Sequence, residues 1–449
     1  MEAQKKIIVR YPPSPTGLLH VGNVRTLLFN YLFAKKNSGQ IVFRLEDTDK
    51  ERSKEEYAND IIDNLKWLGI EPDFSTTVRQ SDRTDVYKKY LTKLIEEGKA
   101  YLSKEEFTEE GQRAEVIRFK NPNTKIKFHD LIRGDIEFDT SDLKDFVIAK
   151  SLDEPIYHMA VVVDDFEMGV THIIRGDDGI SNTPRQILIQ EAIGAPRPIY
   201  AHVPLVLAED KSKLSKRKHG EFVSVSYYKT AGYLPEAMVN FLALIGWNPG
   251  TEQEIFSKEE LINNFDIERV QKKSGIFNIE KLNWINREHI LRQSAEENFS
   301  IFNFQFSKTK WCDHPKSQNE EFMHKFMQIL IDRIHRWGEV SELLEAGEYD
   351  YLFDLPTYEA PLLVWKKSNQ EKARGHLTRM LEIITESENI DLAWQEIFEY
   401  AEKEGKGDVL WPLRTALSGR EKSPDPHTLI MILGKEETQQ RIQNALSKL

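Results

Sequence analysis

The chain has 449 residues, enough for about three average domains and several hydrophobic cores. Its 61 basic and 73 acidic residues give a net charge of −12, and 40% apolar with 30% charged residues is a globular composition, which excludes a disordered chain. The single cysteine, Cys312, excludes a disulfide framework and any metal site built from several cysteines. No apolar run approaches the roughly 20 residues that span a bilayer, and the first ten residues lack a signal-peptide layout, so we expect a cytoplasmic protein with no membrane partner.

The N-terminal quarter of the chain predicts an alternation of strands and helices. Two β-branched runs, 7–9 and 41–43, predict strands, and apolar residues spaced three and four apart predict a helix over 24–32 between them. The sequence Ser53-Lys54-Glu55-Glu56 has a capping-box pattern and opens a second helix, which Gly69 stops. This βαβα order predicts a parallel sheet with right-handed crossovers.

The pattern changes further along, where short β-like runs at 126–128, 136–138 and 147–149 predict a small inserted α/β module. Strand and helix signals resume at 172–174, and from about residue 235 onward the pattern is almost wholly helical. We therefore expect a doubly wound α/β domain, split by an insertion and followed by an all-α C-terminal half. The expected boundaries are 1–90 and 161–225 for the two halves of the α/β domain, 91–160 for the insertion, and 226–300 and 301–449 for two helical regions.

Three polar residues follow predicted strands of the α/β domain. Arg10 and Glu46 end the first two strands, and Arg175 ends a later one. In open parallel sheets, ligands bind beyond the carboxyl ends of the strands. The sequence therefore predicts that these three side chains share one binding site.

The loop from Pro13 to Asn23, between the first strand and the first helix, predicts a phosphate site. Its prolines stiffen the loop, and Gly17 and Gly22 let a ligand approach the backbone closely. The helix after Gly22 presents free N–H groups and a positive dipole end, and His20 can donate a hydrogen bond to a phosphate oxygen. The alternative is a proline-rich loop whose histidine packs locally.

A run of basic residues, 211–220, follows the last predicted strand of the α/β domain. Ammonium groups at Lys213, Lys216 and Lys218 would neutralise a triphosphate and its departing pyrophosphate, which stabilises charge that develops in a transition state. The alternative is a solvated basic loop, which is the commoner fate of such a charge run.

The acidic segment 44–49 carries three carboxylates at a strand end. Carboxylates in this position suit an ammonium group or a divalent metal ion. The alternative is that these acids only cap the following helix, and it applies above all to Asp47 and Asp49. Glu46 lies nearer the strand and is the better candidate for binding.

Taken together, these motifs resemble those of class I aminoacyl-tRNA synthetases. Pro13-Ser14-Pro15-Thr16-Gly17 with His20-Val21-Gly22 resembles the HIGH signature, and Lys213-Leu214-Ser215-Lys216-Arg217 resembles the KMSKS loop. From about residue 7 to the C-terminus the chain is similar to bacterial-type glutamyl-tRNA synthetases, as seen in RLEDTD (44–49), IRGDD (174–178) and PRPIYAHVPLV (196–206). Glutaminyl relatives usually carry PEPNG where this chain has PSPTG.

The resemblance implies a Rossmann-type catalytic domain, an inserted acceptor-binding module, a helical stem-contact domain and an α-helical anticodon-binding region. It implies ATP with Mg²⁺, and L-glutamate and tRNA(Glu) as partners of a monomeric enzyme. Such enzymes make glutamyl-adenylate and then pass glutamate to the 2′-hydroxyl of the terminal adenosine of the tRNA. They typically need bound tRNA before they activate glutamate.

The resemblance also assigns roles to individual residues. Arg10 would pair with the side-chain carboxylate of glutamate, because a guanidinium in a dry pocket prefers a carboxylate to the neutral amide of glutamine. The other amino-acid ligands would be Ser14, Glu46 for the α-ammonium group, and Tyr157 with Arg175 for the α-carboxylate. ATP would contact Thr16, His20, Gly22, Asp178, Leu205, Val206, Lys213 and Lys216, of which His20, Lys213 and Lys216 are catalytic. The alternatives are a buried tyrosine at 157 and a structural pair between Arg175 and Asp177.

The C-terminal half would read the anticodon. Segment 365–379 carries five Lys or Arg residues against one acid, so its Lys366, Lys367 and Arg374 are candidate phosphate contacts, with a solvated helix face as the alternative. Alignment with the family adds Arg333 and the pair Ser423-Pro424 near the anticodon.

The chain departs from the family pattern in two places. Asn23 stands where the signature has its last histidine, a position at which glutamyl members vary. Segment 100–104 lacks the cysteines through which many bacterial members bind structural zinc. We therefore expect no zinc, and a reduced acceptor-binding module.

Other functions share part of this pattern. A glutaminyl-tRNA synthetase would differ in the amino acid that it charges. A shorter glutamyl-transferring paralogue lacks the C-terminal anticodon region, and a nucleotidylyltransferase has no use for it. A catalytically inactive tRNA-binding paralogue is disfavoured by the intact His20, Glu46, Lys213 and Lys216.

Overall fold

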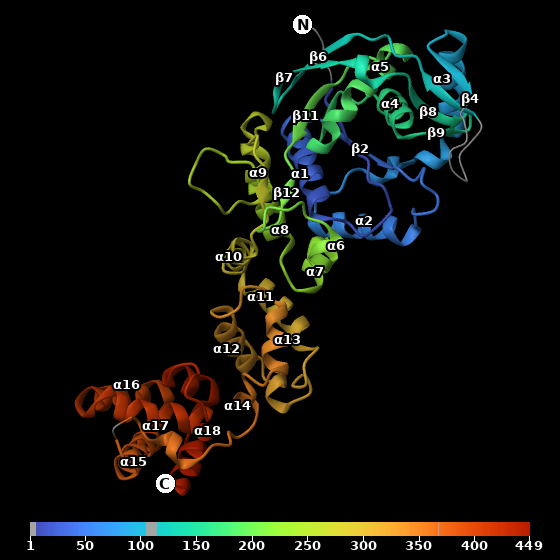
Figure 1. Cartoon of the computed structure of the whole chain (residues 1–449). Coiled ribbons are helices and arrows are strands. Elements are labelled where there is room, and N and C mark those ends of the chain that lie inside the picture. Colours follow the sequence, from blue (N-terminus) through green and yellow to red (C-terminus); the bar gives the residue numbers. More distant parts are fainter. Residues whose placement is uncertain (1–5, 105–114, 367) are drawn as a thin grey trace. The chain divides into compact units, whose positions relative to one another are not determined.

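The computed structural model describes residues 6–104, 115–366 and 368–449. The chain forms two compact units, Met1–His289 and Ile290–Leu449 (Figure 1). The first unit is mixed α/β and the second is helical. Within the described ranges, no helix combines the length and the apolar character that a membrane crossing needs.

Parallel strands form the centre of the first unit. In one sheet, β1 (Ile8–Tyr11), β2 (Gln40–Leu45) and β3 (Val78–Arg79) pair in that order, and in another, β10 (His172–Gly176) pairs with β11 (Ile199–Val203). The Thr171 N–H donates to the Ile8 carbonyl at 2.9 Å, which joins the start of β10 to β1. The strand order therefore switches between β1 and β10, the point at which doubly wound folds bind their ligands.

Helices connect these strands. The sequence predicts α1 (Val21–Lys36), α2 (Glu55–Leu68) and α5 (Thr183–Ile193), but it does not predict α4 (Tyr157–Glu167). The apolar stripe of α1, including Val24, Leu27 and Leu28, is fully buried, which explains why this segment forms a helix here. Pro184 lies in the first turn of α5, where its missing N–H costs no hydrogen bond.

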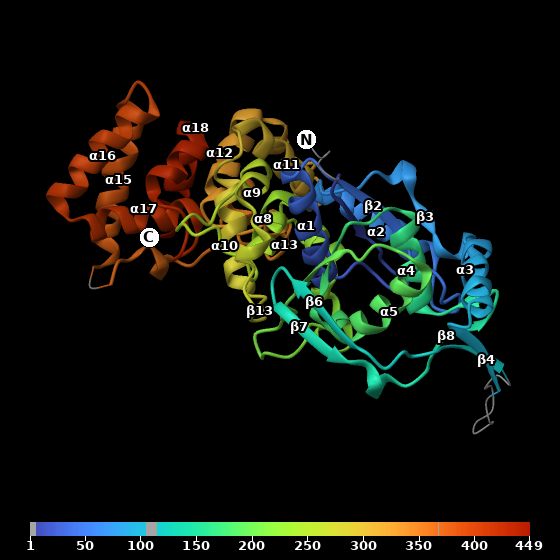
Figure 2. The ribbon, with the colours of Figure 1, turned by 90° about the horizontal axis from the view of Figure 1, so that it is seen from above.

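Along the chain, a four-stranded antiparallel sheet is inserted between the two halves of the α/β domain. Its strands pair in the order β4 (Ala100–Lys104), β5 (Glu115–Phe119), β8 (Phe146–Ser151) and β9 (Glu154–Pro155). The helix α3 (Thr84–Glu96) lies beside β4 and β8 in both views of the ribbon (Figures 1 and 2). Leu91 and Leu94 of α3 and Ile117 of β5 are buried in one hydrophobic core.

Two of the predicted β-like runs belong to a different sheet from the third. They form the hairpin of β6 (Lys125–Asp130) and β7 (Gly134–Asp139), and β6 pairs in parallel with β11, with Asp130 opposite Tyr200. The third run lies in β8 of the antiparallel sheet. The hairpin therefore extends the sheet of β10 and β11, and its Ile126 and Phe128 pack in the same core as Tyr200.

The remainder of the first unit is mostly helical. The short strands β12 (Val206–Leu207) and β13 (Gly275–Ile276) pair in parallel, and this pairing joins the helical segment of the first unit to its α/β part. The helices are α6 (Lys216–His219), α7 (Val225–Thr230), α8 (Pro235–Leu244), α9 (Lys258–Asn264) and α10 (Ile279–Ile290).

The second unit confirms the predicted helical C-terminal half. Its helices are α11 (Ala295–Phe306), α12 (Glu320–Ile331), α13 (Gly338–Glu345), α14 (Asp350–Phe353), α15 (Gln370–Glu386), α16 (Ile390–Glu404), α17 (Lys406–Ser418) and α18 (Pro426–Lys448). Within α18, Gly434 has non-helical backbone angles (φ 76°) and marks a kink. Phe326 and Trp337 are fully buried in the core of this unit.

The start of α2 differs from the sequence prediction. Lys54, not Ser53, is the N-cap residue, and its side chain makes no capping hydrogen bond. The Ser53 hydroxyl is buried without a hydrogen-bond partner, while the Ser53 N–H donates to the Asp49 carbonyl at 3.0 Å. The predicted capping box is therefore wrong, because the helix begins one residue later than the pattern requires. Gly69 ends the helix as predicted, in the left-handed conformation (φ 64°).

An aspartate at position 54 is expected to supply the missing cap. Lys54 already has the extended backbone of an N-cap (φ −134°, ψ 144°), and a carboxylate there would accept hydrogen bonds from N–H groups of the first turn. We expect Lys54→Asp to raise the free energy of unfolding by about 1 kcal/mol, measured by urea denaturation. Ser53→Ala, the control, should change it by less than about 0.5 kcal/mol, and an equal gain in the control would show that capping is not the cause.

Candidate active site

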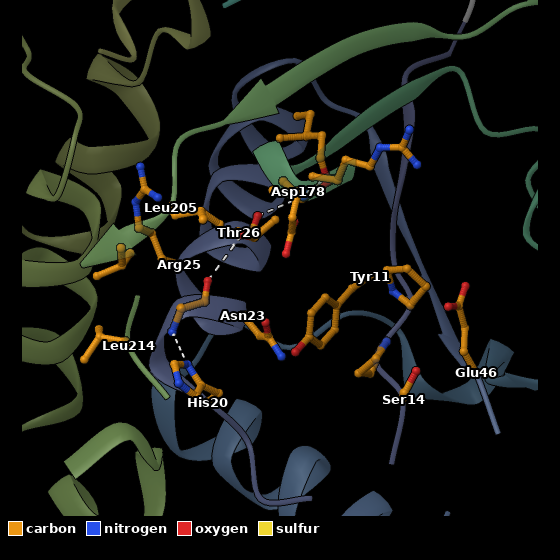
Figure 3. A pocket seen from close by; sticks show the side chains of 18 of the residues that line it. Tyr11, Ser14, His20, Asn23, Arg25, Thr26, Glu46, Asp178, Leu205 and Leu214 are labelled. Carbon is orange, nitrogen blue, oxygen red and sulfur yellow. Dashed lines mark hydrogen bonds between the residues drawn. The ribbon is translucent and has the colours of Figure 1, made fainter. Parts of the chain in front are cut away.

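A cavity of about 510 Å³ lies beyond the carboxyl ends of β1, β2 and β10 (Figure 3). The predicted residues that line it are Arg10, Ser14, Thr16, His20, Gly22, Glu46, Tyr157, Arg175, Asp178, Leu205, Val206 and Lys213. Lys216, the first residue of α6, is not among the lining residues. Figure 3 shows Glu46 and Ser14 towards one end of the cavity and His20 and Leu214 towards the other, with Tyr11 and Asn23 between them.

Arg10 lies at the Glu46 end with loosely held partners. Its side chain is buried, its Nε lies 3.4 Å from an Asp165 carboxylate oxygen, and its Nη1 donates to the Ile174 carbonyl at 3.4 Å. Both contacts are long for charged hydrogen bonds, which favour about 2.7–2.9 Å. The guanidinium thus keeps hydrogen-bonding capacity for a ligand carboxylate.

Arg44 pairs with the carboxylates on one side of the cavity, and sequence analysis did not identify it as a site residue. It is fully buried, and its Nη2 lies 3.0 Å from Glu46 Oε1 and its Nη1 lies 2.9 Å from Asp165 Oδ1. Its Nε lies 3.5 Å from Asp164. Asp164 and Asp165 follow Tyr157 on α4 by seven and eight residues, a spacing that places all three on one helix face and is visible in the sequence.

Burial raises the pKa of the Glu46 carboxyl, and the Arg44 guanidinium opposes that shift. A bound ammonium group beside Glu46 would lower this pKa again, because it would favour the charged carboxylate. The other two acidic residues of segment 44–49 bind protein groups and do not line the cavity. Asp47 accepts hydrogen bonds from the Ser81 N–H and hydroxyl at 2.8 Å, and Asp49 pairs with Arg52.

Neither alternative for Tyr157 and Arg175 fits the structure. The Tyr157 side chain is 44% exposed, so it is not a buried core tyrosine. Asp177 pairs with Arg133, and Arg175 instead bonds to uncharged groups of the protein. Burial lowers the pKa of the Arg175 guanidinium.

His20 caps α1, which begins at Val21. Its Nδ1 accepts the Gly22 N–H at 3.0 Å, so His20 itself occupies one of the first N–H groups of this helix. Burial and the nearby Lys213 charge lower the His20 pKa, which keeps the ring neutral, with its proton on Nε2. The Leu214 backbone accepts a hydrogen bond from the ring, so the signature histidine contacts the basic loop directly.

The basic loop is partly neutralised by acidic residues. Lys213 Nζ lies 3.1 Å from Asp178 Oδ2, which places one ammonium group at the edge of the cavity. Lys218 pairs with Asp210 and also donates to the Ser212 hydroxyl at 2.9 Å. Within the residues that the structure describes, no group of three or more His, Cys, Asp or Glu residues is placed to hold a metal ion.

The predicted tRNA residues lie in the second unit. Arg333 follows α12, and its charge opposes the burial that raises the pKa of Tyr349. The Lys366 ammonium group lies 4.5 Å from the ring centroid of Trp365, and Arg374 is exposed on α15. Ser423 Oγ donates to the carbonyl of the buried Pro424 at 3.0 Å, just before α18. Lys367 lies outside the described residues.

Family models match both units of the chain. A model described as "tRNA synthetases class I (E and Q), catalytic domain" matches residues 6–110 and 102–284. A model described as "Anticodon binding domain" matches residues 295–446.

Relatives match along nearly the whole chain. A glutamate–tRNA ligase of Carboxydothermus hydrogenoformans is 41% identical, covering 97% of this chain and 99% of its own. One of Aquifex aeolicus is 40% identical, covering 99% of each chain. A crystal structure of a glutamate tRNA ligase from Elizabethkingia meningosepticum in complex with its amino acid is 29% identical, with a TM-score of 0.86, and covers 99% of this chain and 100% of that chain. By its catalytic-domain match and these relatives, this chain belongs to the class I tRNA synthetases of the E and Q type, in the glutamate–tRNA ligase family.

Proposed function

We propose that this chain activates L-glutamate with MgATP and transfers the glutamyl group to the terminal adenosine of tRNA(Glu). The observation that carries the proposal is the buried Arg10 guanidinium, whose protein contacts are long and which lines the cavity together with Glu46. This pairing of a cation and an acid suits an amino acid that carries a carboxylate on its side chain. Family membership supports the same substrate.

The two ends of glutamate find opposite charges in this site. Arg10 is proposed to bind the side-chain carboxylate in a charged hydrogen-bonded pair, and Glu46 the α-ammonium group. Ser14 and Tyr157 are proposed as further amino-acid contacts, and Arg175 as the partner of the α-carboxylate. Glutamine would offer the Arg10 guanidinium a neutral amide in place of a carboxylate, leaving it only the long contacts with Asp165 and Ile174, so the charged substrate is favoured.

ATP is proposed to occupy the opposite end of the cavity. Its nucleoside would lie near Leu205, Val206 and Asp178, and its phosphates near Thr16, His20 and Gly22, with Mg²⁺ arriving on those phosphates. An α-carboxylate oxygen of glutamate attacks the α-phosphorus, the adenylate forms, and pyrophosphate leaves with the bonding electrons. The ammonium groups of Lys213 and Lys216 stabilise the charge that develops, and the neutral His20 Nε2–H would add a donor once it turns from the Leu214 backbone to a phosphate oxygen.

In the second step, a hydroxyl of the terminal adenosine attacks the carbonyl carbon of the adenylate. The ester bond to tRNA forms, AMP departs with the electrons of the broken bond, and the hydroxyl proton is lost. The second unit is proposed to hold the anticodon arm, with contacts from Arg333, Lys366, Lys367, Arg374, Ser423 and Pro424. Its match to an anticodon binding domain supports this assignment.

Aminoacylation with two amino acids tests the proposal. Purified protein, ATP, Mg²⁺ and total bacterial tRNA are incubated with labelled glutamate or labelled glutamine. Charging with glutamate alone is the expected result. Charging with glutamine would reassign the substrate, and tRNA binding without charging by either amino acid would favour a catalytically inactive tRNA-binding protein.

Arg10→Gln is expected to lower kcat/KM for glutamate by about 10- to 100-fold, because a hydrogen bond to a charged group contributes about 1.5–3 kcal/mol. The fold should survive, since Asp165 keeps its 2.9 Å contact with Arg44. Aminoacylation kinetics with varied glutamate measure the change. Arg52→Gln, which removes an exposed arginine paired with Asp49, is the control and should leave kcat/KM unchanged. Equal kinetics of the Arg10 variant and the wild type would remove Arg10 from substrate recognition.

A further inference from the structure

We propose that Asp130 and His202 are positioning residues, which hold Arg175 in the orientation that the α-carboxylate of the substrate requires. This inference rests on the proposed function, because it takes the cavity beside Arg175 as the glutamate site. Asp130 and His202 are fully buried and are not among the residues that line the cavity, so they would act on the substrate only through Arg175.

Arg175 is held by hydrogen bonds on every side except one. Its Nε donates to His202 Nε2 at 3.1 Å and its Nη1 to Gln186 Oε1 at 2.6 Å. Its Nη2 donates to the Gly179 carbonyl at 3.1 Å and to the Thr183 hydroxyl at 2.7 Å. A guanidinium has five N–H donors, so one N–H, on Nη1, is left for a ligand.

The orientation of Arg175 depends on which nitrogen of His202 carries the proton. His202 Nδ1 lies 2.6 Å from Asp130 Oδ2. Burial acts to raise the pKa of the Asp130 carboxyl, but hydrogen bonds from this histidine and from backbone N–H groups outweigh it and hold the pKa below its ordinary value. The ionised carboxylate accepts a hydrogen bond from Nδ1–H, so the ring proton stays on Nδ1 and Nε2 presents a lone pair. Only that tautomer accepts the Arg175 Nε–H, because a proton on Nε2 would set two donors against each other.

Asp130 is itself fixed by the turn of the β6–β7 hairpin. Its Oδ1 accepts the N–H groups of Ile132 and Arg133 at 3.0 and 2.8 Å, and its Oδ2 accepts the His202 N–H at 3.0 Å. Every acceptor position is therefore in use by a different donor. The hairpin that extends the sheet thus brings its last residue of β6 against β11, behind the site.

Glycine at position 179 is required for the same arrangement. A Cβ atom there would lie 2.6 Å from Arg175 Nε and 2.8 Å from its Cδ, too close for any side chain. The four groups that accept hydrogen bonds from the guanidinium are the Gly179 carbonyl, the Thr183 hydroxyl, the Gln186 amide and the His202 imidazole. None of them is charged when His202 is neutral. Arg175 is therefore held in place by neutral hydrogen-bond acceptors and not by an ion pair with a carboxylate of the protein.

Asp130→Asn tests the proposal, because an amide has one oxygen where the carboxylate uses two. The amide oxygen is expected to keep the two turn N–H groups of Ile132 and Arg133, so the NH₂ faces His202 and gives up the bond to the His202 backbone N–H. The NH₂ would donate to Nδ1, which leaves Nδ1 unprotonated and moves the ring proton to Nε2. In aminoacylation by the full chain, we expect KM for glutamate to rise by about tenfold or more, while KM for ATP stays within about twofold. A rise in both constants, or in neither, would overturn the proposal.

The same hairpin provides a matched control. His129 and Asp135 form another Asp–His pair at 2.7 Å, but both side chains are exposed and neither lines the cavity. Asp135→Asn should leave both KM values unchanged. A change equal to that of Asp130→Asn would show that hairpin stability, not the His202 tautomer, controls the site.

Substitution of His202 supplies an independent measurement. His202→Gln retains an oxygen that can accept the Arg175 Nε–H, and it should keep KM for glutamate within about threefold of the wild type, whereas His202→Leu should raise it at least tenfold. Equal effects of the two variants would contradict the proposal. This comparison also serves if Asp130→Asn does not fold.

A spectroscopic measurement separates failure of this inference from failure of the proposed function. Nitrogen-15 chemical shifts of labelled histidine, assigned to His202 by their loss in His202→Gln, distinguish Nδ1–H from Nε2–H in the whole chain. We expect Nδ1–H in the wild type and Nε2–H in Asp130→Asn. An Nε2 proton in the wild type would overturn the inference even if the protein charges glutamate. The expected tautomers without any charging would overturn the proposed function, and with it the assignment of a glutamate-orienting role to Arg175.

Discussion

Lys216→Ala is expected to lower kcat for aminoacylation by about 10²–10³, with KM for ATP within about twofold of the wild type. Lys216 begins α6, is exposed and does not line the cavity, so it contributes little to binding ATP in the ground state. Its charge is proposed to stabilise the pyrophosphate as it leaves. An interaction made only in the transition state changes kcat and not KM. Kinetics with varied ATP at saturating glutamate and tRNA measure both constants.

Lys218→Ala is the control for this experiment. Lys218 carries the same charge in the same loop, but it is already paired with Asp210 and bonded to Ser212. We expect its removal to change kcat by less than about threefold, since exposed ion pairs contribute about 0–1 kcal/mol. Equal losses in both variants would attribute the effect to the net charge of the loop. An unchanged kcat in Lys216→Ala would remove this lysine from the mechanism.

Arg44→Met is expected to lower the free energy of unfolding by about 3–5 kcal/mol, the usual cost of removing one partner from a buried ion cluster. Arg44 is fully buried between Glu46, Asp164 and Asp165, at 3.0, 3.5 and 2.9 Å. Methionine fills much of the space but leaves these carboxylates with less compensating charge. Urea denaturation measures the loss. Arg79→Met removes a more exposed arginine paired with Glu55 and should lose less than about 1 kcal/mol.

The loss in Arg44→Met should shrink as the pH falls. Burial raises the pKa of Glu46 and Arg44 opposes this, so without Arg44 the pKa rises further. A carboxyl whose pKa is higher in the folded than in the unfolded state destabilises the fold above that pKa, and protonation relieves the cost as the pH falls through it. Denaturation at about pH 8 and about pH 5.5 tests the sign. A loss that stays constant or grows at the lower pH would contradict this account of the cluster.

The parts of the fold that local patterns control were predictable from the sequence. The stripe of Leu27 and Leu28 defines α1, Gly69 ends α2, and the strand ends of β1, β2 and β10 place Arg10, Glu46 and Arg175 around one cavity. Sheet membership was not predictable in the same way. Whether β6 pairs with β11 or with the antiparallel sheet depends on contacts far apart in the sequence, and an apolar run looks the same in either sheet.

The residues that hold the cavity-lining side chains in place could be predicted only in part. The spacing of Tyr157, Asp164 and Asp165 on a helix was readable, but their partner Arg44 lies on a strand more than a hundred residues earlier. The partners of Arg175 come from β10's own loop, α5 and β11, and no single motif contains them. The capping-box error at Ser53 has a local cause, because one residue of register decides whether a side chain can reach the first-turn N–H groups.

The β6–β7 hairpin limits how far this enzyme can be treated as modular. A segment that folded on its own could be exchanged between related enzymes without disturbing the rest. Here Asp130 pairs with Tyr200 of β11 in the sheet and is bonded to His202, so residues 125–139 belong to the sheet that carries the site. A chimera that replaces the whole of 91–160 would therefore graft a foreign edge onto the catalytic sheet. A chimera that keeps 125–139 would leave that edge, and the support of Arg175, as it is.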